Sequence, residues 1–233
     1  MRPFAAVAHG YRAVLDPVER QVIASIVAEV VELLGATLDT VVPDPDEADP
    51  DEADPDGFDR DEAGQLARAV APPSATVPDD TAVLRLLPDA SRDDPAVSEE
   101  FRRLTEGDLR DAKVRRLVAF WRLLQAGGGA AGDRLDLARD DASDLAATLT
   151  DVRLVLADRL GLSDDDQVEA LYTELERDEP DRPTDPETVE DAQRRRFLGS
   201  VYTLLTYLQE SLLTAMLRDL PRDRPRDRPG VGG

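Results

Sequence analysis

Apolar side chains recur at helical spacing through residues 197–217, and this periodicity constrains the fold more than any other feature of the sequence. The residues that share the apolar face are Phe197, Val201, Leu204, Leu205, Leu208, Leu212, Leu213, Met216 and Leu217. Apolar residues at intervals of three and four lie on one side of an α-helix, so this segment predicts a long amphipathic helix. The face is wider than a coiled-coil seam, which suits either an internal position in a helical core or the interface of a homodimer.

Other segments combine helical periodicity with residues that start or end helices. Asp16 suits the N-cap, Pro17 the first helical position and Glu19 the third, which together resemble a capping box. Gly35 is a natural end for that helix. Further helical segments are expected near residues 79–87, 94–105, 109–126, 140–161 and 168–175.

Residues 3–15 predict a short β-hairpin rather than a helix. Two alternating segments flank His9 and Gly10, and Gly10 is expected to supply the positive φ of a tight turn. RLDL at 134–137 is either a short strand or an extended approach to the next helix. The expected fold class is therefore mainly α, a helical bundle of about five helices with a short N-terminal β-hairpin at its edge.

The stretch from Leu86 to Glu106 contains one helix end followed closely by one helix start. Pro88 stops the first helix, and Asp94 with Pro95 forms an N-cap and first-turn proline for the second. We expect Phe101 and Leu104 to return the second helix to the core, with a break near residues 105–108.

Aspartate and proline interrupt the helical pattern between residues 43 and 80, where 13 acidic residues accompany two basic ones. Proline removes backbone hydrogen bonds, and too little apolar surface is present to offset the entropy of ordering. We therefore expect a single helical domain at 1–220, interrupted by an acidic disordered linker at 43–78. A disordered tail rich in proline, arginine and aspartate is expected at 221–233.

The composition excludes several kinds of site and location. The chain of 233 residues has no cysteine and one histidine, His9, which rules out thiol chemistry, disulfides and a histidine-rich metal site. Phosphate-loop, dinucleotide-binding, nucleophile-elbow and zinc-protease motifs are absent from the sequence, so we expect no catalytic, metal-binding or cofactor-binding residues. Neither a signal-peptide pattern nor an apolar run of about 18 residues occurs, so we expect a cytoplasmic protein that does not contact membranes.

The formal net charge of −22 is the reverse of what a free-standing DNA-binding protein normally carries. One local exception, the basic cluster, consists of Arg110, Lys113, Arg115, Arg116 and Arg122. Such a cluster can contact an acidic partner or a phosphate backbone. The alternative is a solvated helix face whose cations pair with neighbouring Glu99, Glu100 and Glu106.

Four polar residues lie within or beside apolar helix faces and are candidates for structural roles. Arg153 is expected to be partly buried and paired with a carboxylate, with Asp151 nearby, which would fix the register of two helices. Gln209 and Glu210 interrupt the strongly apolar final helix, and one of them is expected to bond a backbone group in the core.

Four segments carry a resemblance to a known family. They are LDPVER at 15–20, LLPDASRDDPAVSEEFRRLTEGDLR at 86–110, LTDVRLVLADRLG at 149–161 and YTLLTYLQESLLTAM at 202–216. In this order, after an N-terminal hairpin, they resemble an actinobacterial domain-of-unknown-function family that includes the actinomycete oxidative-stress regulators (AosR). The motifs are structural and contain no reaction chemistry.

The resemblance implies a cytoplasmic regulator of oxidative-stress transcription that works through a protein partner such as a sigma factor. Family genes also lie near the adaptor of the Clp protease, which implies the alternative of an accessory factor in regulated proteolysis. Direct DNA binding by the folded core is a third hypothesis. The redox switch proposed for that regulator uses a cysteine pair, and this chain has no cysteine, so the switch does not carry over.

Overall fold

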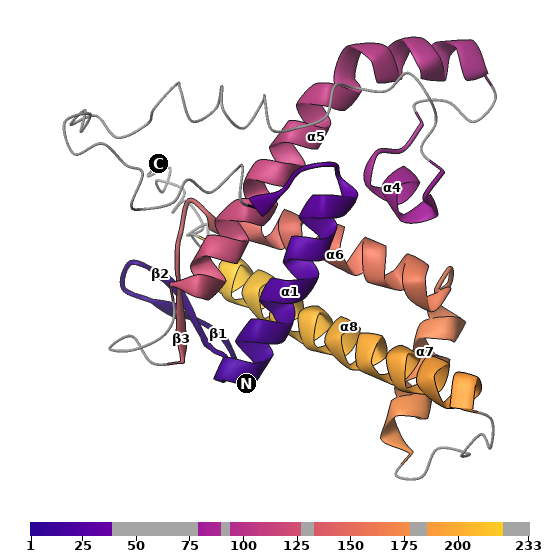
Figure 1. The fold of residues 1–233 in the computed structure, drawn as a ribbon. Coiled ribbons are helices and arrows are strands. Elements are labelled where there is room, and N and C mark those ends of the chain that lie inside the picture. The colour runs from indigo at the N-terminus through magenta and orange to yellow at the C-terminus, as the bar shows by residue number, and fades with distance from the viewer. Residues whose placement is uncertain (39–78, 90–93, 127–132, 178–185, 221–233) are drawn as a thin grey trace, which may run out of the picture.

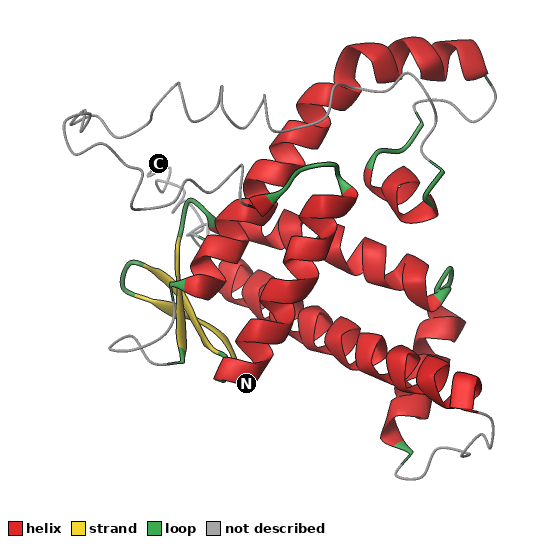
Figure 2. Ribbon diagram, viewed as in Figure 1, coloured by secondary structure: helices red, strands yellow, loops and turns green. Residues whose placement is uncertain are grey.

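The computed structural model describes residues 1–38, 79–89, 94–126, 133–177 and 186–220. The predicted acidic linker at 43–78 and the predicted tail at 221–233 lie outside these described residues. The mainly α prediction is confirmed, with six helices and a small antiparallel sheet in the described part (Figures 1 and 2). The helices are α1 (Pro17–Leu33), α4 (Thr81–Leu86), α5 (Pro95–Gln125), α6 (Ala142–Leu160), α7 (Asp165–Glu176) and α8 (Pro186–Asp219).

The sheet contains the predicted hairpin and one further strand. Its strands are β1 (Arg2–Val7), β2 (Gly10–Val14) and β3 (Arg134–Ala138), in the order β1-β2-β3 with both pairs antiparallel. RLDL is therefore a strand, and β3 lies against the N-terminal hairpin. Leu135 and Leu137 alternate with exposed neighbours and face the core, as expected of a strand with one buried side.

Gly10 is needed for its positive φ, as the sequence suggested, and for a second reason that only the fold shows. The turn consists of Ala8 and His9, and Gly10 begins β2 with a φ of 158°, a value that residues with a Cβ rarely adopt. A Cβ atom at Gly10 would also lie 1.9 Å from the backbone oxygen of Leu137. Backbone conformation and the close approach of β3 therefore both exclude a side chain at this position.

The predicted start of α1 is confirmed in detail. The Asp16 carboxylate accepts from the backbone N–H groups of Val18 and Glu19, while Glu19 Oε2 accepts from the Asp16 N–H at 2.9 Å. This reciprocal capping box satisfies donors that the first turn would otherwise leave unpaired. The helix then buries Ile23, Val27 and other apolar residues against α5.

Helix α5 differs from its prediction because it continues through 31 residues without a break. Gly107 lies within it, which a helix tolerates when its other residues favour continuation. The N-terminal part of α5 extends past the other helices (Figure 1), and Phe101 and Leu104 are 48% and 62% exposed. The expectation that these two side chains return to the core was wrong, because the buried side of this part of α5 carries Ser98, Arg102 and Glu106 instead.

Helices α6 and α8 form the most extensive helix pair of the fold, and most of the predicted apolar face of α8 is used there. Leu205, Leu208 and Leu212 are fully buried. Phe197, Leu213 and Leu217 lie on the same helix but are exposed, so the predicted face was too wide. Helix α7 is longer than the segment expected near residues 168–175, and Asp164 caps it by accepting from Gln167 N–H.

Candidate functional site

A groove of about 740 Å³ lies where the C-terminal half of α5 passes β3 and the start of α6. Figure 1 shows this end of α5 beside the sheet, at the opposite end from its projecting N-terminal part. The groove depends on β3, because this strand carries the chain from the end of α5 back along the sheet to α6. Its lining residues are Ala112, Arg115, Arg116, Ala119, Phe120, Arg122, Leu123, Ala126, Asp136, Leu137, Asp141, Asp144 and Leu145.

The two walls of the groove carry opposite charge. All three arginines among the lining residues lie on α5, whereas all three aspartates lie on β3 or at the start of α6. Buried apolar side chains, among them Phe120 and Leu145, line the groove between them. Apolar surface flanked by charges of both signs is typical of surfaces that hold a peptide segment or a partner helix.

Arg115 and Arg122 are the members of the basic cluster that point to solvent, and both line the groove. They are seven residues apart, two turns of helix, so they project from the same side of α5. One turn before Arg115, burial raises the pKa of the Asp111 carboxyl, while the positive charge of Arg115 lowers it in part. The two exposed arginines of the cluster thus lie on the α5 wall of the groove.

Lys113 and Arg116 instead belong to an ion cluster between α5 and α6. The Lys113 ammonium donates to Asp151 Oδ1 at 2.5 Å, and Arg116 Nη2 donates to Asp151 Oδ2 at 3.4 Å. Asp151 and Lys113 are buried, while Arg116 is partly exposed and also lines the groove. Asp151 thus has a structural role as the single carboxylate between two cations.

Arg110 lies outside the groove and serves the packing of α5 against α1. Its guanidinium donates to the backbone oxygen of Leu34 at 2.8 Å and to Glu106 Oε1 at 2.7 Å. Glu106 is buried and also contacts Arg102 at 3.1 Å. The basic cluster is therefore not one continuous surface, because successive positions of a helix face different neighbours.

Arg153 and Gln209 join α6 to α8 through a polar network in the core. Arg153 Nη1 donates to Gln209 Oε1 at 2.5 Å, so its partner is an amide rather than the expected carboxylate. The Arg153 guanidinium also lies over the ring of Tyr202, 5.1 Å from its centroid. Gln209 donates in turn to the backbone oxygen of Ala146, and Glu210 is exposed.

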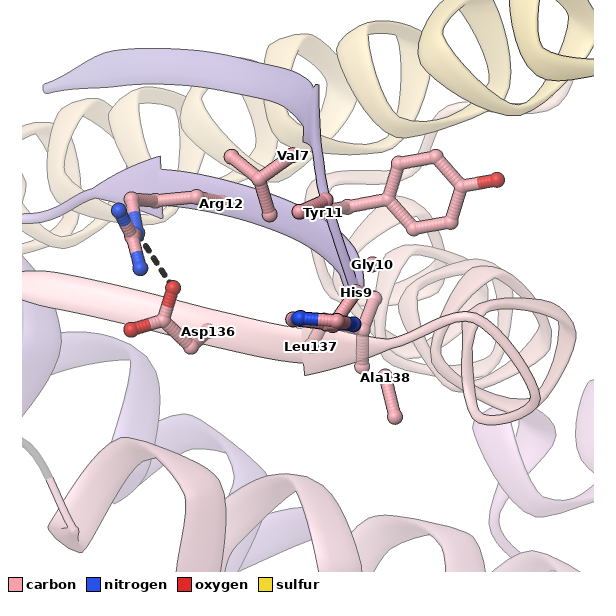
Figure 3. Close-up of a pocket in the computed structure, with 9 residues that line it drawn as sticks. Val7, His9, Gly10, Tyr11, Arg12, Asp136, Leu137 and Ala138 are labelled. Atoms are coloured by element: carbon pink, nitrogen blue, oxygen red, sulfur yellow. Dashed lines mark hydrogen bonds and ion pairs between the residues drawn. The ribbon is translucent and has the colours of Figure 1, made fainter.

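A second hollow of about 450 Å³ lies at the edge of the sheet and contains His9. Figure 3 shows Arg12 and Asp136 pointing toward each other across β2 and β3, joined by a hydrogen bond, while Tyr11 points away from them. Burial and the neighbouring Asp219 carboxylate raise the pKa of the Tyr11 hydroxyl. The hollow offers an exposed ion pair, an imidazole and the Tyr11 side chain, whose hydroxyl donates to Asp219 Oδ2 at 3.2 Å.

Sequence reasoning missed two buried arginines, Arg20 and Arg102, and the acidic wall of the groove. Arg20 is buried and donates to the backbone oxygens of Leu124 and Arg134, which ties α1 to the end of α5 and to β3. Asp141 occupies the N-cap position of α6, but its carboxylate makes no capping bond. Only the position of β3 beside α5 shows that this residue faces the groove.

The described residues contain no group of three or more acidic or histidine side chains arranged to hold a metal ion. Among the described helices, none combines the length and apolarity needed to cross a membrane.

The described residues define a mainly helical fold with a small antiparallel sheet and a groove bordered by α5, β3 and α6. The chain belongs to a family described as a domain of unknown function (DUF2017), which matches residues 1–216. The family match therefore includes every lining residue of the groove. No curated protein and no solved structure matches the chain.

Proposed function

We propose that the protein is a non-enzymatic cytoplasmic regulator that acts by contact with a component of the transcription machinery, such as a sigma factor. As part of this proposal, we infer that the protein resembles the actinomycete oxidative-stress regulators within its family, on the basis of the segments at 15–20, 86–110, 149–161 and 202–216. The observation that carries the proposal is the groove between α5, β3 and α6, with Arg115 and Arg122 on one wall.

The chemistry of the groove favours protein contact over a reaction. Its ionisable side chains are guanidinium groups and carboxylates. Arginine is enriched at protein interfaces, where its planar group pairs with carboxylates and packs against apolar surface. The apolar lining adds area that a partner can bury.

Affinity capture from the native host tests this proposal with charge-reversed variants. The double variant Arg115→Glu and Arg122→Glu is expected to lose at least about tenfold of a captured transcription component, because like charges would then face an acidic partner. Arg194→Glu is a matched control, since Arg194 is an exposed arginine of α8 that does not line the groove. Equal capture by the double variant and the wild-type protein would contradict the proposal.

The same experiment separates the two other hypotheses. Capture of protease components in place of transcription components would support the accessory role in regulated proteolysis. Direct DNA binding requires a gel shift at low salt that weakens steeply as salt rises, because the bound cations release counterions. The aspartates opposite Arg115 and Arg122 work against a phosphate backbone in this groove, so we expect no shift.

A further inference from the structure

The groove-facing side of α5 has the residue spacing of a helix-packing seam. Five lining residues follow one another at intervals of four, three, four and three: Ala112, Arg116, Ala119, Leu123 and Ala126. This alternation keeps one side of a helix against a partner helix in coiled-coil packing. The seam spans 14 residue steps, about 21 Å at a rise of 1.5 Å per residue. Nothing in the described fold covers Ala119 and Ala126, which are exposed.

Alanine at alternate positions of the seam allows a second helix to approach closely. Interaxial distances between packed helices depend on the side chains at the contact, and small residues favour the shorter distances. Leu123, partly buried between the exposed alanines, supplies an apolar contact for that helix. The seam therefore fits a helix whose own side chains are larger than those of α5.

The flanking charges specify which edge of such a helix is acidic and which edge is basic. Arg115 and Arg122 both precede an alanine of the seam by four residues, which places them along one edge of the contact. In coiled coils the corresponding edge positions pair with opposite charges on the partner. Asp141 and Asp144 are exposed on the other wall, so the far edge of the bound helix meets negative charge.

We propose that the groove binds an amphipathic helix of the partner protein, with acidic residues along the edge that faces Arg115 and Arg122 and basic residues along the edge that faces Asp141 and Asp144. This inference rests on the proposed function and specifies the partner's contact segment. A second copy of this chain is a poorer fit, because an antiparallel α5 would place arginines opposite Arg115 and Arg122.

Two labelled helical peptides test the inference directly. Both have three heptads with leucine at the seam positions; one has glutamate along one edge and lysine along the other, and the second has lysine along both edges. Fluorescence anisotropy with the full-length protein measures binding. Exchanging the two edges is not an informative control, since a helix that binds in the reverse direction restores the same pairs.

We expect the peptide with one glutamate edge to bind at least about tenfold more tightly than the peptide with lysine along both edges. In the double variant Arg115→Glu and Arg122→Glu this preference is expected to reverse, because the α5 wall is then acidic. Ala119→Trp should abolish binding of both peptides by filling the seam, and Arg194→Glu should change neither affinity. Thermal unfolding verifies that each variant remains folded; Arg115, Arg122 and Ala119 are exposed positions.

Equal affinity for both peptides, no binding by the glutamate-edged peptide, or an unchanged preference in the double variant would each overturn the inference. If capture of a transcription component still depended on Arg115 and Arg122, the proposed function would stand while the helical partner segment would not. If the glutamate-edged peptide bound as predicted but affinity capture recovered no transcription component, the inference about the groove would be supported and the proposed function would be contradicted. Elution of the protein as a dimer that dissociates on adding the peptide would make a second copy the occupant and would overturn the inference.

Discussion

Replacement of Asp151 by alanine is expected to lower the free energy of unfolding by about 3–5 kcal/mol, because it leaves the buried Lys113 ammonium without a counter-charge. Asp151 is buried between Lys113 and Arg116, and among the described residues it is the only carboxylate that pairs with both. Alanine removes both acceptor oxygens, whereas Lys113, which is 9% exposed in the wild-type structure, stays between α5 and α6. Urea unfolding followed by circular dichroism gives the change in free energy.

A matched double variant distinguishes an unpaired charge from lost packing. Asp151→Leu together with Lys113→Met removes the central ion pair and refills its volume, and we expect it to recover most of the stability lost in Asp151→Ala. Arg116 is partly exposed, so solvent can take over the hydration that Asp151 supplied. If Asp151→Ala unfolds with the wild-type free energy, the cluster does not hold α5 against α6.

Replacement of Gly10 by alanine is expected to destabilise the fold by about 1–3 kcal/mol, the usual range for forcing atoms into occupied space. The added Cβ would lie 1.9 Å from the backbone oxygen of Leu137, and neither strand can move without disturbing the ladder between β2 and β3. Because β3 also forms part of the groove, we expect the variant to lose peptide binding along with stability.

His9→Ala is the matched control for Gly10→Ala. His9 is an exposed residue of the neighbouring turn, so its replacement should change the free energy of unfolding by no more than about 0.5 kcal/mol. The two variants differ in whether the new atom meets backbone. Equal stability of Gly10→Ala and the wild-type protein would show that β3 does not approach β2 as closely as described.

Local chemistry explains why the sequence predicted so many of the helix boundaries. Asp16 with Glu19 at the start of α1 involves groups only a few residues apart, and so does Asp94, whose carboxylate accepts from Val97 N–H at the start of α5. Capping depends on these short separations, and therefore it can be recognised from sequence alone. The same applies to Gly161, whose φ of 70° ends α6 in the left-handed conformation.

The failed predictions share a dependence on distant neighbours. Phe101 has helical spacing with other apolar residues, but whether such a residue is buried depends on what the rest of the fold places beside it. The contact that excludes a side chain at Gly10 was not predicted, because β3 lies more than 120 residues away in the chain. Arg153 was assigned a carboxylate partner, whereas the tertiary fold supplies the Gln209 amide.

Only the basic wall of the candidate site could be predicted from the sequence, for the same reason. The basic cluster marked α5, but helix geometry alone did not show which cations face solvent and which face α1 or α6. In the structure, Lys113 and Arg116 pair with the buried Asp151, and Arg110 pairs with the buried Glu106. Arg115 and Arg122 are exposed and line the groove. The acidic wall, formed by Asp141 and Asp144, requires the chain reversal through β3.

Site-specific photo-crosslinking in the native host tests most directly the central claim that the groove contacts a protein of the transcription machinery. A photoreactive phenylalanine at Asp144, exposed on the α6 wall of the groove and outside the α5 seam, is compared with the same residue at Asp191, exposed on α8 outside the groove. We expect a crosslink from position 144 to a transcription component, identified by mass spectrometry, and none from position 191. No protein crosslink at position 144, or the same products at both positions, would contradict the claim.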